Sequence, residues 1–258
     1  MKDKRTKVSG VIITFNEERN IARCLQSLQG LCDEIVVIDS YSTDQTKKIC
    51  QSFNVKFIEH AFSGHIEQKN FALSQTKYDL VLSLDADEAL SPKLSESIKF
   101  ALENWDNEAF VFNRFTNYAG TWIKHSGWYP DAKLRLWDKR NGVWGGTNPH
   151  DSVQLSKAVS IKYLKGDLFH YSYYSIEEHI IKATRYTKIA AIAMNKQGKK
   201  SSVTKMILSS SFRFVRDYFF RLGFLDGFYG LIICATASYT TFLRYAYLKR
   251  LNTGKNID

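Results

Sequence analysis

The segment Leu80–Glu88 constrains the fold more than any other part of the chain. Its five mostly apolar residues do not alternate with polar ones, which is typical of a strand covered on both faces and hence of a largely parallel sheet. The run ends in Asp85, Asp87 and Glu88, and Ser91-Pro92 then supplies an N-cap and a first-turn proline for a helix. These acids are therefore predicted at the carboxyl edge of the sheet, where open α/β sheets bind ligands.

The spacing of Asp85 and Asp87 suits a metal site. Two carboxylates one residue apart can converge on a divalent cation, and Mg²⁺ typically takes one or two acids together with substrate phosphates. A pair this short is also common as a solvated acidic turn, so the surrounding sequence must decide between the two interpretations.

Four strand-helix units precede residue 105, which predicts a doubly wound, mostly parallel, Rossmann-like α/β sheet. Strands are expected at 8–15, 34–39, 55–59 and 80–84. Asn16 is expected to cap the first helix, and Ser42 to Gln45 forms a capping-box pattern for the second. The last two helices are expected at 66–74 and 92–104.

Acids and other polar side chains, rather than glycines, follow these strands. The sequence contains no G-x-G-x-x-G, so the dinucleotide fingerprint is absent. The candidates for ligand contact at the sheet edge are Thr14, Asn16, Glu17, Asp39, Asp85 and Asp87.

An aromatic-rich segment, residues 122–131, separates predicted strands at 109–118 and 134–137. Long loops in compact domains are usually functional, and flat aromatic faces pack against sugar rings. The aromatic side chains concerned are Trp122, Trp128, Tyr129 and Trp144. The same side chains could instead fill the core. Further strands are expected at 152–155 and 159–164.

The carboxyl-terminal part is predicted to be helical and basic. A capping box at Ser175 to Glu178 begins a helix to about Asn195, and residues 197–202 form a linker, which places the domain boundary between 1–195 and 196–258. Residues 196–258 hold eleven Lys and Arg against three Asp and Glu, a balance of +8 in a chain of net charge +10.

Phenylalanines and arginines interleave in residues 206–222, as in an amphipathic interfacial helix. Residues 227–243 are seventeen uncharged residues, at the lower limit of about 17 for a spanning helix, so we expect insertion into one leaflet or packing at the membrane surface. The alternative is a buried helical hairpin or a homo-oligomer interface.

Other features indicate the cytoplasm. Cysteines 24, 32, 50 and 234 form no C-x-x-C pair or zinc spacing, which favours reduced thiols. The apolar run at 11–13 is too short for a signal peptide. The expected location is cytoplasmic and peripheral, on the inner face of the cytoplasmic membrane.

Four stretches together resemble family 2 glycosyltransferases of the GT-A fold over about the first 195 residues. They are Ile13–Glu17, Ile38–Asp44, Gln68–Asn70 and Leu84–Glu88. The chain is also similar to the branch that adds sugars to the lipopolysaccharide core, typified by a β-1,4-glucosyltransferase. That similarity rests on Trp128–Asp131, Arg135-Leu136, His150-Asp151 and Gly223–Gly227.

The resemblance implies that Thr14, Glu17 and Asp39 hold the nucleotide, that Asp85 contacts the ribose or a metal-bound water, and that Asp87 holds the metal. It also implies a UDP-hexose donor, with glucose as the sugar, an inverting outcome and a glycan or lipid-linked acceptor. The chain departs from the branch at one position, because Asp151 stands where relatives tend to carry glutamate after the histidine.

The chemistry supports these assignments independently. The sugar nucleotide leaves as a diphosphate, whose charge Mg²⁺ or Mn²⁺ at Asp87 can neutralise, with Lys69 and Arg135 sharing that task. Asp151 is the first candidate for general base and Asp131 the second. His170 is a candidate further metal ligand. The candidates for acceptor or sugar contact are Trp128, Tyr129 and His150.

The rival functions are a sugar nucleotidyltransferase and a non-catalytic basic binding protein. A sugar nucleotidyltransferase usually has a glycine-rich phosphate loop after the first strand, where this chain has Thr14–Glu18. A non-catalytic basic membrane-surface or nucleic-acid-binding protein is suggested by the tail, but no recognisable nucleic-acid module is present, and a carboxylate-lined edge would repel phosphates without a metal. We expect no nucleic-acid partner.

Overall fold

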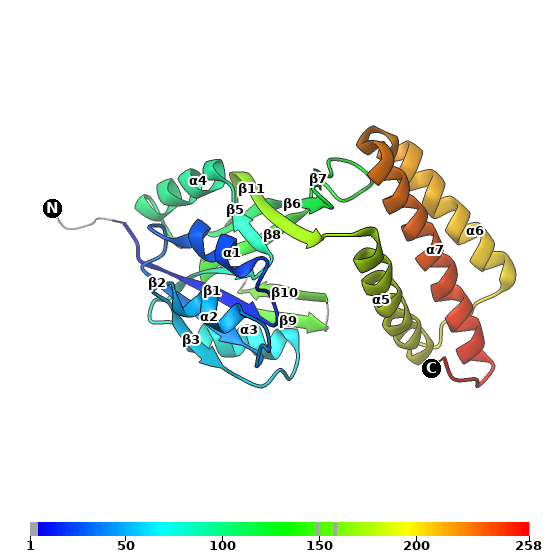
Figure 1. Cartoon of the computed structure of the whole chain (residues 1–258), viewed down its shortest axis with the longest axis horizontal. Coiled ribbons are helices and arrows are strands. Elements are labelled where there is room, and N and C mark those ends of the chain that lie inside the picture. The colour runs from blue at the N-terminus through cyan, green and yellow to red at the C-terminus, as the bar shows by residue number, and fades with distance from the viewer. Residues whose placement is uncertain (1–4, 148–149, 157–158, 258) are drawn as a thin grey trace. The chain divides into compact units, whose positions relative to one another are not determined.

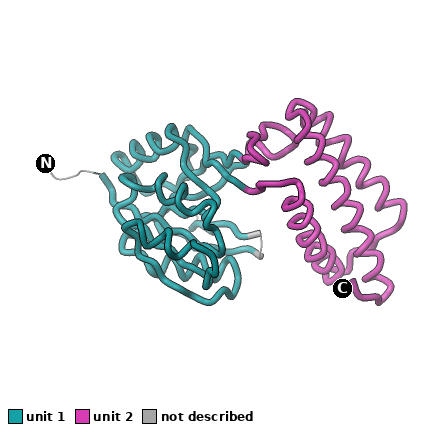
Figure 2. The backbone as a smooth tube through the Cα atoms, viewed as in Figure 1, with its two compact units in different colours: residues 1–115, 131–171 teal, residues 116–130, 172–258 magenta. Residues whose placement is uncertain are grey.

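The computed structural model describes residues 5–147, 150–156 and 159–257, without the side chains of residues 147 and 150. It divides into two compact units, drawn in different colours in Figure 2. Unit 1 comprises residues 1–115 and 131–171, and unit 2 comprises residues 116–130 and 172–258. Each unit is described separately below.

Unit 1 begins with the predicted parallel sheet (Figure 1). Its strands run in the order β3-β2-β1-β4, and every neighbouring pair is parallel. These strands are β1 (Val8–Thr14), β2 (Glu34–Asp39), β3 (Lys56–Glu59) and β4 (Leu80–Asp85). The helices between and after them are α1 (Ile21–Leu28), α2 (Thr46–Gln51), α3 (His65–Ser74) and α4 (Pro92–Glu103).

Successive residues of these strands build two separate cores, because side chains alternate between the two faces of a sheet. On one face, Ile12 and Leu82 pack in a cluster with residues of α1 and α4. On the other, Val11 and Val81 pack in a cluster with residues of α3. The continuous apolar runs thus correspond to strands covered on both faces, and the predicted α/β fold class is confirmed.

The second half of the sheet adds antiparallel pairs to the parallel ones. From β4 the order continues β8-β6-β11-β5, while β7 pairs with β6 and β9 forms a separate antiparallel pair with β10. The bounds are β5 (Glu88–Leu90), β6 (Ala109–Tyr118), β7 (Thr121–Trp122), β8 (Ala132–Asp138), β9 (Gly142–Thr147), β10 (His150–Leu155) and β11 (Ile161–Tyr173). The sequence did not predict β5, β7 or β9, which are short or rich in glycine.

Two of the four predicted helix caps are confirmed. The hydroxyl of Ser91 accepts a hydrogen bond from the backbone N–H of Leu94 in α4, and that of Ser175 accepts one from Glu178 in α5 (Ile176–Lys196). The predictions for Asn16 and Ser42 were wrong: α1 begins at Ile21 and α2 at Thr46, neither with a side-chain cap. Both polar side chains instead bind each other's loops at the sheet edge, as described below.

Unit 2 is mainly helical. It contains α5, α6 (Val203–Val215), a π-helix η1 (Arg216–Phe220), a 3-10 helix η2 (Gly223–Asp226) and α7 (Gly227–Asn252). Both α5 and α6 pack against α7. The compact units separate after residue 171, and α5 buries His179, Thr187 and Ala191 within the helical unit. The domain boundary after 195 stays a prediction.

None of the described helices is by itself both long and apolar enough to cross a membrane. Residues 203–220 and 223–252 satisfy the length and composition criteria only when taken together, and they are bent by 71° relative to each other.

An aromatic cluster surrounds His179 in unit 2. The Tyr118 ring is fully buried and lies edge-on to Trp128 and to His179, with centroid distances of 5.8 and 5.3 Å. Tyr173 and Tyr229 complete the group around Tyr118. The hydroxyl of Tyr118 and Nδ1 of His179 form a 3.1 Å hydrogen bond. This cluster joins the 116–130 segment to α5 and α7.

The burial of His179 predicts that the protein is less stable at low pH. Desolvation lowers the pKa of His179 from 6.5 to about 4, so the folded protein binds this proton more weakly than the unfolded chain does. Above about pH 6.5 the ring is neutral in both states, so His179 does not reduce the free energy of unfolding. As the pH falls from 6.5 toward 4, the unfolded chain takes up the proton first, and the free energy of unfolding decreases by up to ~3 kcal/mol. Denaturant unfolding at pH 7.5 and 4.5 measures this loss.

Two variants test the assignment. His179→Gln cannot be protonated and should flatten the pH dependence, whereas His65→Gln in unit 1 should leave it as in the wild type. An unchanged pH dependence in His179→Gln would show that other groups control acid unfolding.

Candidate functional site

Three predicted ligand-binding side chains lie next to one another at the carboxyl edge of the parallel strands. The strand register pairs Thr14 with Asp39, and Ile13 with Asp85. The Thr14 hydroxyl oxygen is buried and has no hydrogen-bond partner among the residues that the structure describes. Thr14, Asp39 and Asp85 therefore lie at one edge of the sheet, as expected from their positions at the ends of the predicted strands.

Two loops at this edge hold each other in place. Asp39 is fully buried, and its carboxylate accepts hydrogen bonds from the backbone N–H and the hydroxyl of Ser42, at 2.8 and 2.5 Å. The Asn16 N–H donates to the Ser42 hydroxyl oxygen, and the Asn16 side-chain oxygen accepts from the Thr43 N–H. The Glu17 N–H donates to the Thr46 hydroxyl oxygen. In this structure the polar groups of Asn16 and Asp39 thus shape the loop.

Asp85 lies between two buried cations at the end of β4. Its Oδ1 is 2.9 Å from Lys69 Nζ, and its Oδ2 accepts a 2.8 Å hydrogen bond from Arg135 Nη2. Burial alone would raise the pKa of Asp85, but the charges of Lys69 and Arg135 outweigh it and hold the pKa well below its usual range. Asp85 is therefore ionised at every physiological pH.

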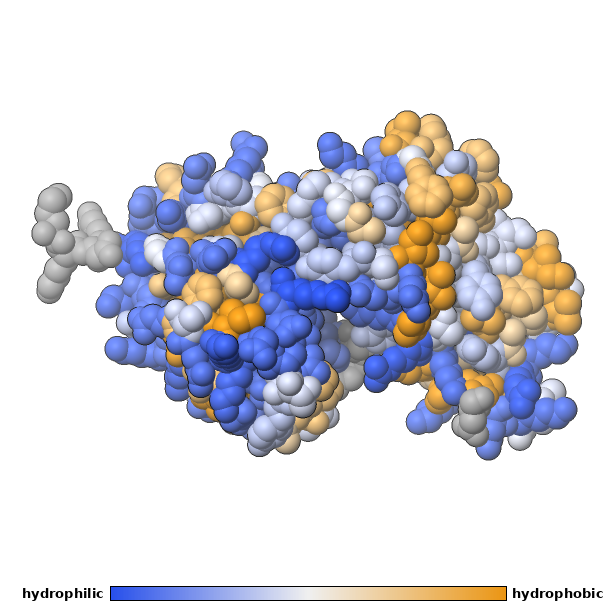
Figure 3. All heavy atoms as spheres, in the orientation of Figure 1, coloured by the Kyte–Doolittle hydropathy of each residue, from blue (hydrophilic) through white to orange (hydrophobic). Residues whose placement is uncertain are grey.

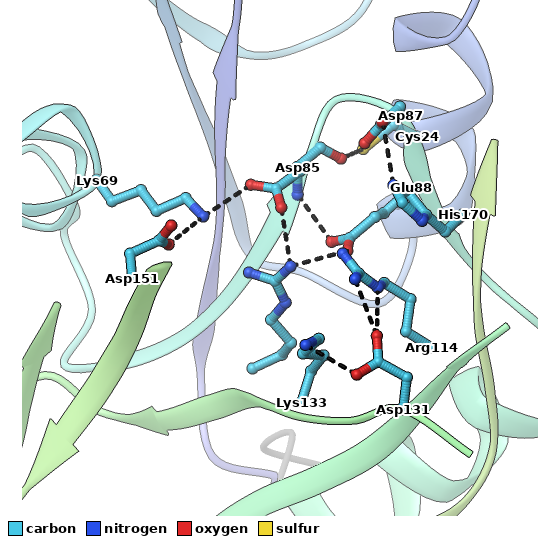
Figure 4. Close-up of polar contacts among 11 residues, drawn as sticks. Cys24, Lys69, Asp85, Asp87, Glu88, Arg114, Asp131, Lys133, Asp151 and His170 are labelled. Carbon is cyan, nitrogen blue, oxygen red and sulfur yellow. Dashed lines mark hydrogen bonds and ion pairs between the residues drawn. The ribbon is translucent and has the colours of Figure 1, made fainter. Parts of the chain in front are cut away.

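Lys69 joins Asp85 to Asp151, although 66 positions separate the two acids in the sequence. Its ammonium group donates to Asp151 Oδ2 at 2.8 Å (Figure 4). The same group lies 4.3 Å from the ring centre of Trp144. The amide of Asn70 also holds the β9 backbone, donating to the Trp144 carbonyl oxygen and accepting from its N–H. Helix α3 thereby fixes the β9-β10 pair, and with it Asp151, beside the strand end that carries Asp85.

Arg135 continues the network to residues that the sequence analysis gave no role. Its Nη2 also donates to Oε1 of the buried Glu88, whose Oε2 accepts from the Asp85 N–H. Burial opposes the charge of Arg135, but Glu88 and Asp85 raise its pKa above the ordinary value. Arg114 lies 3.6 Å from Glu88 and donates through Nε to Asp131. The signal for Arg114 was that it is the one charged residue of β6.

Asp131 is held by two cations. Its Oδ2 is 2.9 Å from both Nε and Nη2 of Arg114, and its Oδ1 is 2.9 Å from Lys133 Nζ. Asp151 forms an ion pair with Lys69. In Figure 4, Asp151 lies to the left of Asp85, beside Lys69, and Asp131 lies to its lower right, beside Arg114.

Asp87 and His170 form the second part of the site. Asp87 Oδ2 lies 3.3 Å from His170 Nε2, and the Asp87 carbonyl oxygen accepts from the Tyr171 N–H. Antiparallel pairing of β5 with β11, which places Glu88 opposite His170, brings the two residues together. No group of three potential ligands occurs within residues 5–147, 150–156 and 159–257. One carboxylate and one imidazole nevertheless fit a cation that takes its other ligands from phosphate and water.

The predicted sugar-binding aromatics occupy different places. Trp144 is buried in the unit 1 core next to Trp137, so the core alternative holds for its ring. Trp128 packs in the aromatic cluster of unit 2, and Tyr129 is partly buried in the same segment. Trp122 lies in β7. The His150 side chain is outside the described residues.

The fold and the site define a class of α/β enzyme with a charged ligand site at the carboxyl edge of a parallel sheet. The sequence model of glycosyl transferase family 2 matches residues 9–166, which include all the acids of this site, and the chain belongs to that family. It is therefore a glycosyltransferase, and both rival functions are excluded.

Two curated relatives extend over nearly the whole chain. An uncharacterized glycosyltransferase of Rickettsia typhi is 36% identical over 95% of this chain and 88% of its own length. The lipopolysaccharide core biosynthesis glycosyltransferase LpsC of Rhizobium meliloti is 28% identical over 97% of this chain and 96% of its own length. Among solved structures, S. aureus TarS in complex with UDP is 14% identical, with a TM-score of 0.48 over 98% of this chain and 93% of that chain.

Proposed function

We propose that this glycosyltransferase transfers glucose from UDP-glucose, with inversion, to a lipopolysaccharide-core or other lipid-linked glycan. The observation that carries the proposal is the linked set of Asp85, Lys69 and Asp151 beside Asp87 and His170, in a chain of family 2. The similarity to LpsC over both full lengths supports an acceptor of the lipopolysaccharide core.

The donor diphosphate would bind at the carboxyl edge. Asp87 and His170 would hold Mg²⁺ or Mn²⁺, which when bound supplies positive charge to the departing diphosphate. Lys69 and Arg135, which both contact Asp85, would add positive charge there, and Glu88 keeps Arg135 in position. Thr14, Glu17 and Asp39 surround the proposed nucleotide site, and the buried Thr14 hydroxyl could bond to a ligand there.

Asp151 is the better candidate for the general base. Such a base must accept a proton from the acceptor hydroxyl, and each neighbouring cation disfavours protonation. Asp131 is bonded to two cations, Arg114 and Lys133, whereas Asp151 is bonded to Lys69.

The proposed location is the inner face of the cytoplasmic membrane, where a lipid-linked acceptor would be presented. The net charge of +8 in residues 196–258 supports this location, because anionic lipids attract basic segments.

A donor screen tests the proposed reaction. Purified protein is incubated with UDP- and GDP-sugars, a lipopolysaccharide-core acceptor and either Mg²⁺, Mn²⁺ or EDTA, and nucleoside diphosphate release is measured. We expect release to be fastest with UDP-glucose and to be lost in EDTA. Faster release with another nucleotide sugar would refute the proposed donor, and undiminished release in EDTA would refute the metal.

A further inference from the structure

The bend between α6 and α7 exposes an unusual number of large apolar side chains. We call residues 212–228 the elbow; it includes η1, η2 and the adjoining helix ends. Phe220 is 78% exposed, Phe228 64% and Phe212 63%. Phe219, Phe224 and Leu225 are also exposed. Figure 3 shows hydrophobic residues gathered at the top of unit 2, where the elbow lies in Figure 1.

The exposed residues continue along the helices as stripes. On α6, Leu208, Phe212 and Val215 recur at steps of four and three residues, and Phe219 follows four residues later. On α7, Phe228 and Leu231 begin a second exposed stripe. This spacing marks one face of a helix, so each helix has an apolar face that the chain itself leaves uncovered.

Three arginines gather beside this apolar surface. Asp217 in η1 is 1% exposed and forms ion pairs with Nε of Arg213 at 2.5 Å, Nε of Arg216 at 2.8 Å and Nη1 of Arg221 at 3.3 Å. One negative charge thus meets three positive charges. Each guanidinium carries five N–H donors and uses one nitrogen in its pair, and each side chain is 31–45% exposed. The group can therefore also bind phosphate oxygens.

The charge of the segment favours an anionic bilayer over a second copy of the chain. Residues 203–252 carry seven Lys and Arg against two Asp and Glu, a balance of +5. Pairing two copies through this surface would bring like charges together, whereas anionic lipid neutralises them. Arginine also suits the interface, since its stem can lie along apolar groups while its head reaches the phosphates.

We propose that the elbow inserts into one leaflet of an anionic membrane, with Phe212, Phe220 and Phe228 in the acyl region and Arg213, Arg216 and Arg221 on lipid phosphates. This inference rests on the proposed membrane location and names the part of unit 2 that makes the contact. Asp217 acts as a positioning residue that keeps the three guanidinium groups together.

Vesicle flotation tests the insertion. Wild-type protein should float with vesicles of 30% phosphatidylglycerol in phosphatidylcholine, and part of the binding should survive 0.5 M NaCl, because apolar burial is not screened by salt. Phe220→Ser should lower the vesicle partition coefficient roughly tenfold or more. Phe100→Ser, at a phenylalanine of unit 1 that is 69% exposed, is the matched control and should bind like the wild type.

The arginine group has its own variant. Arg216→Gln should weaken binding about fivefold at low salt and less at high salt, whereas Lys99→Gln on α4, with the same loss of charge, should not. Equal effects of the two substitutions would show that net charge alone matters and would overturn the phosphate role.

A second measurement does not depend on affinity. Lipids brominated in the acyl chain should quench the tryptophan fluorescence of Phe220→Trp more than that of the wild type. They should not add quenching in Phe100→Trp. Absence of added quenching would overturn insertion. So would a wild-type protein that never floats and that forms a dimer which Phe220→Ser dissociates.

An activity assay separates this proposal from the proposed function. UDP release is measured with a delipidated core acceptor. If the wild type binds vesicles but releases no UDP, the proposed function is refuted while the membrane contact of the elbow is not.

Discussion

Asp87→Asn is expected to lower glycosyl transfer by on the order of 10³-fold or more while the protein stays folded. Asp87 contributes the carboxylate that, with His170 Nε2 at 3.3 Å, fits a divalent cation. An amide keeps the shape of the side chain but loses the charge that attracts the cation, so the departing diphosphate would not be neutralised. Diphosphate release measures the effect, and thermal unfolding checks the fold.

The control and the metal readout separate this role from a structural one. Asp79→Asn replaces a half-exposed aspartate of unit 1 that pairs with Arg140, and it should retain activity. Mn²⁺ binding, followed by electron paramagnetic resonance in the presence of UDP, should weaken in Asp87→Asn and in His170→Ala. A folded Asp87→Asn protein with normal turnover would eliminate the assignment.

Asp151→Asn is expected to reduce turnover by on the order of 10²–10⁴-fold without weakening donor binding, as loss of a proton acceptor would. The amide can still accept a hydrogen bond from Lys69 but cannot take a proton from the acceptor hydroxyl. Turnover is measured with saturating donor and acceptor, and donor affinity is measured by titration with UDP.

Asp131→Asn is the comparison for this prediction. Asp131 is bonded to Arg114 and Lys133, so its replacement should perturb β6 and β8 locally and reduce turnover less. Should Asp131→Asn show the large loss with intact UDP affinity, and Asp151→Asn not, the base would be Asp131.

Local patterns predicted the first half of the fold well, because buried parallel strands and their connecting helices have strong sequence signals. The continuous apolar run of β4 and the Ser91 and Ser175 caps depend on residues near one another in sequence. The short strand β5 has no such signal, because three residues carry no periodicity. It exists through its pairing with β11, about 80 residues later.

The same distinction applies to the caps. Ser42 and Asn16 have the composition of helix N-caps, but tertiary contacts use their hydrogen-bonding groups elsewhere. The division into units likewise depended on packing, since α5 packs against α7, a helix that begins only at Gly227.

For the site, the sequence by itself determined which residues stand at the strand ends and that acids rather than glycines occupy them. The tertiary structure alone decided their partners: Lys69 between Asp85 and Asp151, Glu88 on Arg135, and Asp87 beside His170. Strand order and register set these contacts across 66 positions for Asp85 and Asp151 and 83 positions for Asp87 and His170. No local pattern predicts contacts between residues so far apart in the sequence. The periodicity of residues along a helix or strand indicates which face each side chain occupies, but not which residue it contacts there.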